Sequence, residues 1–137
     1  MTTAREIMTT GTECIGENES VAEAARMMRD LDVGALPICG EDNRLKGMIT
    51  DRDIAVGCVA EDGDPSRMRS GDFGHDDVVT IGADADIGDA LRTMKEHRIR
   101  RLPVIEGHDL VGMISQADVA RSLAPDRVGD LVGAISV

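Results

Sequence analysis

The stretch GMITDRDIA, residues 47–55, returns as GMISQADVA at residues 112–120, a shift of 65 residues. Upstream of it, SVAEAARMMRDLDVGALPI (20–38) aligns with DIGDALRTMKEHRIRRLPV (86–104) at a shift of 66. A chain of 137 residues with the same pattern twice is built of two small repeats. Because a unit of about 55 residues buries little apolar surface, we expect the two repeats to share one core.

Both repeats have the same predicted order of elements: strand, helix, strand, strand, helix. Apolar residues at helical spacing predict the helices, and a polar turn between two apolar runs predicts each strand pair. The elements are expected at 12–15, 20–31, 35–39, 45–50 and 51–60, and again at 77–81, 86–97, 101–105, 110–115 and 116–124. The sequence therefore predicts an α/β (α+β) chain, with repeats at 7–60 and 75–124, a linker at 61–74 and a tail at 125–137. The tail is expected to be either a helix packed on a dimer partner or a partly mobile end. Its apolar residues Val128, Leu131, Val132 and Ile135 fall on one helical face.

The composition is strongly acidic, with 26 acidic and 15 basic residues and a net charge of −11. Nucleic acid and anionic membranes need a basic surface, so neither is expected as a partner. No apolar run reaches the ~20 residues of a membrane span, and the first residues lack a signal-peptide core. We therefore expect a soluble, cytoplasmic protein. Phe73 is the only aromatic residue, so a planar ligand would lie between aliphatic side chains.

The repeated stretch places Thr50 three residues before Asp53, and Ser115 three residues before Asp118. One interpretation is structural: each pair forms a capping box at the start of a helix. The other is functional, because a helix N-terminus and a hydroxyl donor favour a phosphate. An ionised aspartate one turn further on accepts hydrogen bonds from two adjacent sugar hydroxyls. The spacing is consistent with both.

The doubled strand and motif, with the opening TAREIMT at 3–9, resemble the CBS domain pair (Bateman module) over roughly residues 4–124. Within that family, the chain resembles the stand-alone, hypoxic-response type of actinobacterial protein. The resemblance implies two pseudo-twofold repeats packed through their sheets, and a homodimer formed through the helices that follow the motifs. It also implies a regulatory, non-catalytic module that binds AMP, ADP, ATP or S-adenosylmethionine in the cleft between the repeats.

The resemblance assigns ligand-binding roles residue by residue. Asp53 and Asp118 would hold ribose hydroxyls, and Thr50 and Ser115 would contact phosphate or sugar. The base and phosphate tail would be bordered by Thr12, Thr80, and the backbone of 34–36 and 100–102.

A basic cluster precedes the second apolar strand and has no counterpart in the first repeat. Its members are Lys95, His97, Arg98, Arg100 and Arg101, which align with Arg29, Leu31, Asp32, Gly34 and Ala35. Basic residues favour a helix C-terminus, which is the structural explanation. Alternatively Arg100 or Arg101 faces a ligand phosphate, with Arg52 as a further candidate. We therefore expect at most one good site for an anionic nucleotide in each chain.

Cysteine and histidine residues leave a second interpretation open. In the family topology the strands of Cys14 and Cys39 are neighbours, so the resemblance makes a disulfide between them plausible, while Cys58 is expected to be buried. The histidines His75, His97 and His108 are weak metal candidates, because no two stand at a ligand spacing. No catalytic motif is present, so no enzyme and no required cofactor are expected. The alternatives are a redox- or metal-responsive stress protein whose motifs are only helix caps, or a subunit that regulates an enzyme in trans.

Overall fold

The computed structural model describes residues 2–74, 78–122, 129 and 132–135 of the chain. The chain divides into two compact units, each of which is described by itself. Unit 1 comprises Met1–Thr12 and Val79–Val137, and unit 2 comprises Glu13–Val78. Within the described ranges, no helix is both long enough and apolar enough to cross a membrane.

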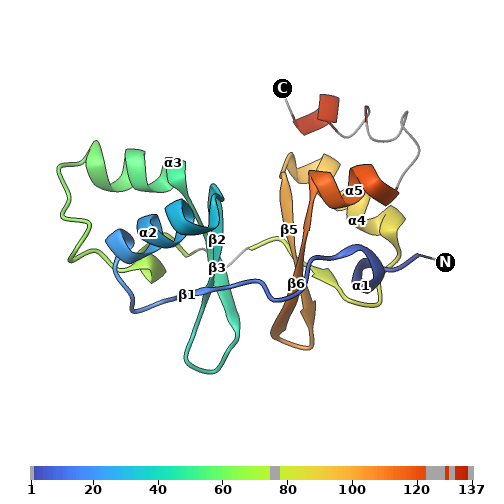
Figure 1. The fold of residues 1–137 in the computed structure, drawn as a ribbon, viewed down its shortest axis with the longest axis horizontal. Helices are drawn as coiled ribbons and strands as arrows, with labels where there is room; N and C mark the ends of the chain where they lie inside the picture. Colours follow the sequence, from blue (N-terminus) through green and yellow to red (C-terminus); the bar gives the residue numbers. More distant parts are fainter. Residues whose placement is uncertain (1, 75–77, 123–128, 130–131, 136–137) are drawn as a thin grey trace. The chain divides into compact units, whose positions relative to one another are not determined.

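Unit 2 is a small sheet covered on one face by helices (Figure 1). Its sheet has the order β1-β2-β3 among the described residues; β1 is parallel to β2, and β2 is antiparallel to β3. Helices α2 and α3 lie on the same side of this sheet (Figure 1). The elements are β1 (Ile15–Gly16), α2 (Val21–Leu31), β2 (Ala35–Cys39), β3 (Leu45–Thr50), α3 (Asp51–Ile54), the π-helical η1 (Ala55–Val59) and the 3₁₀ turn η2 (Ser70–Phe73).

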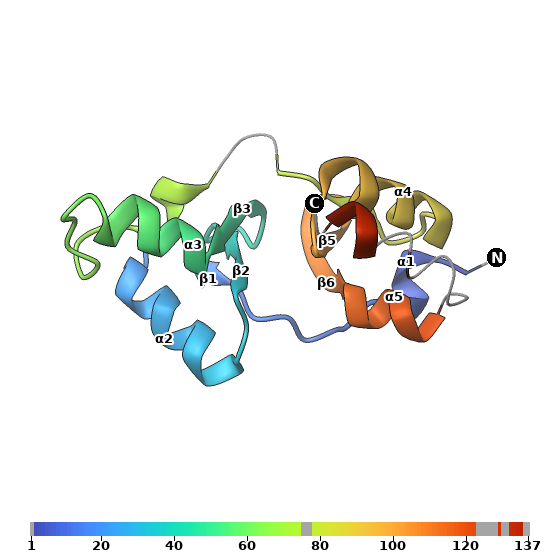
Figure 2. The ribbon, with the colours of Figure 1, turned by 90° about the horizontal axis from the view of Figure 1, so that it is seen from above.

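Unit 1 repeats this plan, with the sheet order β4-β5-β6 in the part that the structure describes. Strand β4 is parallel to β5, and β5 is antiparallel to β6. Figure 2 shows α4 and α5 beside this sheet, with α1 next to α5. The elements are α1 (Ala4–Ile7), β4 (Ile81–Gly82), α4 (Ile87–His97), β5 (Arg101–Glu106), β6 (Asp109–Ser115) and α5 (Gln116–Ser122).

The predicted mixed α/β class and the order of elements in each repeat are confirmed. Helix α2 forms because Val21, Ala24 and Met28 share one apolar face, which is buried against the sheet of unit 2. Ser20 caps its first turn by accepting a hydrogen bond from the Glu23 amide, and left-handed Asp32 ends it. Strands β1 and β4 are shorter than predicted, because only two residues of each pair with the neighbouring strand.

The two units differ from the expected boundaries at the N-terminus and in the linker. Residues up to Thr12 pack with the second repeat, whereas the linker residues around η2 pack with the first. The bonds are equivalent at a shift of 66 residues: the Ile87 amide donates to the Thr2 carbonyl, and the Val21 amide donates to the Met68 carbonyl. Each segment thus accepts a hydrogen bond from an amide in the first turn of a long helix, because such an amide has no partner inside its own helix.

Each unit has its own apolar core beneath its sheet. In unit 2, Ile15, Leu36, Ile38 and Ile49 are buried in the centre. Unit 1 is centred on Leu102, Val104, Ile114 and Val119, and Ile135 of the tail packs against them. Residues 132–135 are helical, and Val128 and Leu131 lie outside the described residues.

Candidate functional site

The motif of the first repeat lies where β3 passes into α3. Thr50 is the N-cap of α3, and its hydroxyl accepts a hydrogen bond from the Asp53 amide at 3.0 Å. In return, the Asp53 carboxylate accepts a bond from the Thr50 amide at 2.9 Å. The predicted capping box is therefore confirmed. The Asp53 side chain is partly exposed, and only one of its oxygens is engaged among the described residues.

The motif of the second repeat has the same reciprocal bonds but more partners. The Ser115 amide donates to the Asp118 carboxylate at 2.8 Å, and the Ser115 hydroxyl is within hydrogen-bond distance of both the carboxylate and the amide of Asp118. The carboxylate also accepts bonds from the Thr9 hydroxyl, at 3.1 Å, and from the Arg121 guanidinium. Asp118 is only 3% exposed. The two aspartates therefore differ in accessibility, although their local sequence is alike.

The start of an apolar strand lies beside each motif. In unit 2, the Asp51 amide donates to the Gly34 carbonyl at 2.9 Å, and Ala35 pairs with Thr50. In unit 1, the Gln116 amide donates to the Arg100 carbonyl at 3.2 Å, and Arg101 pairs with Ser115. The backbone stretches assigned by resemblance thus adjoin the motifs of their own unit.

Two arginines consequently stand next to the second motif, where the first repeat has Gly34 and Ala35. Arg100 is exposed and Arg101 is partly exposed. Within the described part of the chain, neither guanidinium has an ion-pair partner. These two arginines are therefore a local excess of positive charge in an acidic protein.

The other candidate residues lie apart from these contacts. Arg52 is an exposed residue of α3. Thr12 lies at the end of the N-terminal segment, where its hydroxyl donates to the Thr9 carbonyl at 3.4 Å. Thr80 directly precedes β4 and is partly buried. No hydrogen bond joins these three residues to either aspartate within the described ranges.

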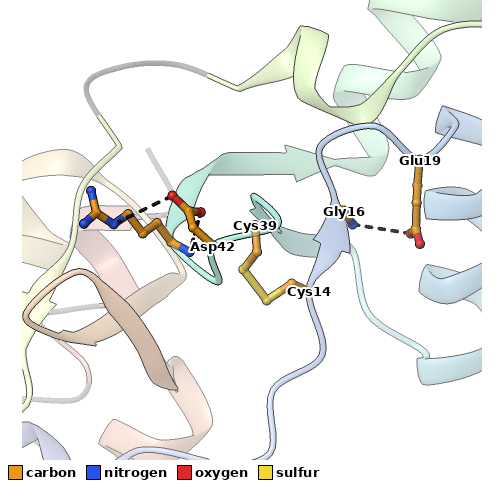
Figure 3. Close-up of a disulfide and its surroundings, with 6 residues drawn as sticks. Cys14, Gly16, Glu19, Cys39 and Asp42 are labelled. Carbon is orange, nitrogen blue, oxygen red and sulfur yellow. Dashed lines mark hydrogen bonds and ion pairs between the residues drawn. A yellow bond between two sulfur atoms is a disulfide. The ribbon is translucent and has the colours of Figure 1, made fainter.

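Cys14 and Cys39 form a disulfide in unit 2 (Figure 3). Their Cα atoms are 5.8 Å apart, and the bond closes a sequence separation of 25 residues. It fastens the residue before β1 to the end of β2, beside the two-residue pairing of these strands. Nearby, Asp42 accepts a bond from the Arg44 amide, which together with Lys46 and Arg44 holds the pKa of the Asp42 carboxyl below its usual value. Thr80 and Ile105 stand at the equivalent positions of unit 1.

The remaining cysteine and the histidines are separate from the motifs. Cys58 is a buried free thiol in η1. His97 ends α4 and His108 lies in the turn between β5 and β6, both exposed, while His75 lies outside the described residues. The described ranges contain no group of three metal-ligating side chains.

Sequence reasoning missed Thr9 and Arg121. Arg121 stands one helical turn after Asp118, and this spacing is a usable signal. Thr9 is 109 residues away from Asp118 in the chain, so no local pattern indicates the contact.

Comparison with known proteins gives matches over nearly the whole chain. A family model described as "CBS domain" matches residues 4–57 and again residues 71–125. Hypoxic response protein 1 of Mycobacterium tuberculosis is 47% identical over 135 residues, which cover 98% of this chain and 94% of that protein.

Two solved structures have a similar fold. One is a crystal structure of Hypoxic Response Protein I with two coordinated zinc ions, with a TM-score of 0.84 and 47% identity, over 90% of this chain and all of that one. The other is CBSX2 in complex with AMP, with a TM-score of 0.78 and 21% identity, over 89% of this chain and 96% of that one.

Proposed function

The chain belongs to the CBS domain family, as a tandem pair, and we propose that it is a non-catalytic regulatory protein that binds an adenosine-containing ligand or interacts with another protein. The ligand classes are AMP, ADP, ATP and S-adenosylmethionine. The observation that supports ligand binding best is that the Asp53 side chain is partly exposed and accepts only one hydrogen bond among the described residues. Its carboxylate lies in the first turn of α3 with one oxygen unengaged among the described residues, in the motif by which the chain resembles its family.

The chemistry of the motif suits a nucleoside. An ionised carboxylate accepts hydrogen bonds from two adjacent hydroxyl groups, as on the ribose of AMP. Thr50 of the same unit offers a hydroxyl one turn away. In unit 1, Arg100 and Arg101 lie beside the second motif and match phosphate oxygens in charge and geometry. CBSX2, which has a similar fold, was crystallised with AMP. The further ligand-binding candidates of this proposal are Thr12, Thr80, Arg52 and Ser115. Asp118, to which the resemblance also assigned a ribose contact, already accepts hydrogen bonds from Thr9, Ser115 and Arg121.

A thermal denaturation experiment tests the proposal. A ligand that binds only the native state raises the thermal midpoint as RT ln(1 + [L]/Kd), so each ligand is added at ~1 mM. We expect at least one adenosine compound to raise the midpoint. Guanosine monophosphate at the same concentration is the control and should not raise it. If none of the four compounds raises it, the proposal of an adenosine sensor is wrong.

We further propose that the protein is a homodimer formed through the helices that follow the motifs. In the first repeat, η1 exposes two valines, Val56 at 49% and Val59 at 64%. Large aliphatic side chains on a short helical face are candidates for burial against a second copy.

The second candidate function is a redox-responsive protein whose motifs act only as helix caps. The disulfide between Cys14 and Cys39 and the reciprocal capping bonds favour it. Non-reducing mass spectrometry of aerobically purified protein decides whether the bond forms: one free thiol is expected, and three free thiols would eliminate this candidate.

A further inference from the structure

The N-terminal segment, residues 2–9, is held to unit 1 by a row of backbone hydrogen bonds. The Arg5 amide donates to the Ala83 carbonyl, and Thr9 exchanges amide-to-carbonyl bonds with Met113, at 2.8 and 3.0 Å. Gly112 permits this close approach, because a Cβ there would lie 3.0 Å from the Thr9 carbonyl oxygen. The segment therefore pairs with β6 at Met113, two residues before Ser115 of the second motif.

The side chain of Thr9 also contacts the second motif, through the carboxylate of Asp118. Its hydroxyl is 3.1 Å from one Asp118 carboxylate oxygen and 3.4 Å from the other. Arg121 approaches the first oxygen from the next turn of α5, and the Ser115 amide and hydroxyl donate to the second. Both oxygens are thus occupied by donors of the protein itself, and the residue is 3% exposed. A buried carboxylate is stable when donors satisfy it in this way.

Asp53 at the equivalent position has none of these additional partners. Its carboxylate accepts one bond, from the Thr50 amide, and the side chain is partly exposed. Neither a hydroxyl from another segment nor an arginine binds it within the described residues. The two copies of one motif therefore have different surroundings, although their local capping bonds are the same.

We infer that Asp118 is a positioning residue: it anchors the N-terminal segment through Thr9 and is not a ligand group. In consequence the two repeats do not bind a ligand in the same way, and ligand binding does not depend on Asp118. This second part rests on the proposed adenosine ligand, whereas the anchoring part does not.

Hydrogen exchange of single amides, followed by nuclear magnetic resonance without any ligand, tests the anchoring. The Thr9 and Met113 amides are the reporters, because they pair with each other's carbonyls. Removing the hydroxyl in Thr9→Val, or the charge in Asp118→Asn, takes away a hydrogen bond to a charged group, so protection of these amides should fall about tenfold. Thr9→Ser keeps the hydroxyl and should restore protection. Thr10→Val at an exposed neighbour and Asp53→Asn in the other motif should leave it unchanged. Protection that stays within about twofold of the wild type in both Thr9→Val and Asp118→Asn would overturn the inference.

Calorimetric titration with AMP tests the ligand part. If wild type binds AMP, Asp118→Asn should bind it with an affinity within about threefold of wild type. A tenfold or greater loss in Asp118→Asn that Thr9→Val does not reproduce would make Asp118 a ligand group and overturn the inference. If the wild type binds no AMP, the proposed function fails for that ligand, and the exchange data alone decide the anchoring.

Discussion

At the scale of single residues, the hydroxyl of Thr50 accepts one capping hydrogen bond whose contribution to stability can be measured separately. It accepts the Asp53 amide, an N–H that has no partner inside the helix. Thr50→Val keeps the shape of the side chain but leaves this amide unsatisfied, so the free energy of unfolding should fall by about 1 kcal/mol. Urea denaturation without ligand measures the change. Thr50→Ser restores the acceptor and should unfold like the wild type; equal losses in the two variants would contradict the capping role.

The capping boxes could be predicted from sequence because their partners stand three residues apart. The same spacing could not show that Asp118 is buried and Asp53 partly exposed, since Asp118 is contacted by Thr9, from a distant part of the chain. A tertiary contact over such a distance leaves no periodic signal. Likewise, the resemblance named both aspartates as ribose ligands, whereas their different surroundings emerge only in the folded units.

At the scale of elements, Gly112 decides how closely the N-terminal segment lies on β6. A Cβ at this position would be 2.5 Å from the Met8 sulfur as well as close to the Thr9 carbonyl. The methionine end can move, but the backbone carbonyl cannot move without breaking its pairing with Met113. Gly112→Ala should therefore lower the free energy of unfolding by about 1–3 kcal/mol.

Gly82→Ala in β4 is the matched control. A Cβ there meets nothing within 4 Å, so the free energy of unfolding should stay within about 0.5 kcal/mol of wild type. Urea denaturation of the two variants side by side checks the comparison. A Gly112→Ala protein as stable as Gly82→Ala would show that the segment does not need this close approach.

Most elements were predictable because each is defined by local pattern. Strands β2 and β3 have the predicted bounds, since each is an apolar run ended by a turn or a cap. It was not predictable that the N-terminal segment packs with the second repeat and the segment around η2 with the first. Residues 2–9 and 68–74 are too short to show a periodic pattern, and they accept hydrogen bonds from amides of helices far along the chain.

At the scale of the whole molecule, the disulfide should stabilise the fold by restricting the unfolded chain. Closing a loop of 25 residues corresponds to about 3.5 kcal/mol in the chain-entropy account. We expect dithiothreitol to lower the free energy of unfolding by about this amount in urea denaturation. Cys14→Ser should show the lower stability with and without reductant. Wild-type stability that does not respond to the reductant would mean that the bond does not form in solution.

The proposed homodimer gives a second prediction at this scale. Val59→Glu places a charge on the exposed apolar face of η1, which should be disfavoured once that face is buried against a second copy. Sedimentation equilibrium should find a dimer for the wild type and a monomer for Val59→Glu. Leu31→Glu, at another exposed apolar position at the end of α2, is the matched control and should remain dimeric. A monomeric wild type, or a dimeric Val59→Glu protein, would contradict the proposed interface.

The binding of an adenosine ligand through the first motif is the central claim, and calorimetric titration of AMP into wild type and Asp53→Asn tests it most directly. The account predicts heat of binding for the wild type. It also predicts at least a tenfold weaker affinity for Asp53→Asn, since the variant loses charged hydrogen bonds to the ribose. Equal binding of AMP by both proteins, or no heat with the wild type for any of AMP, ADP, ATP and S-adenosylmethionine, would contradict the claim and leave the motif of the first repeat as a helix cap.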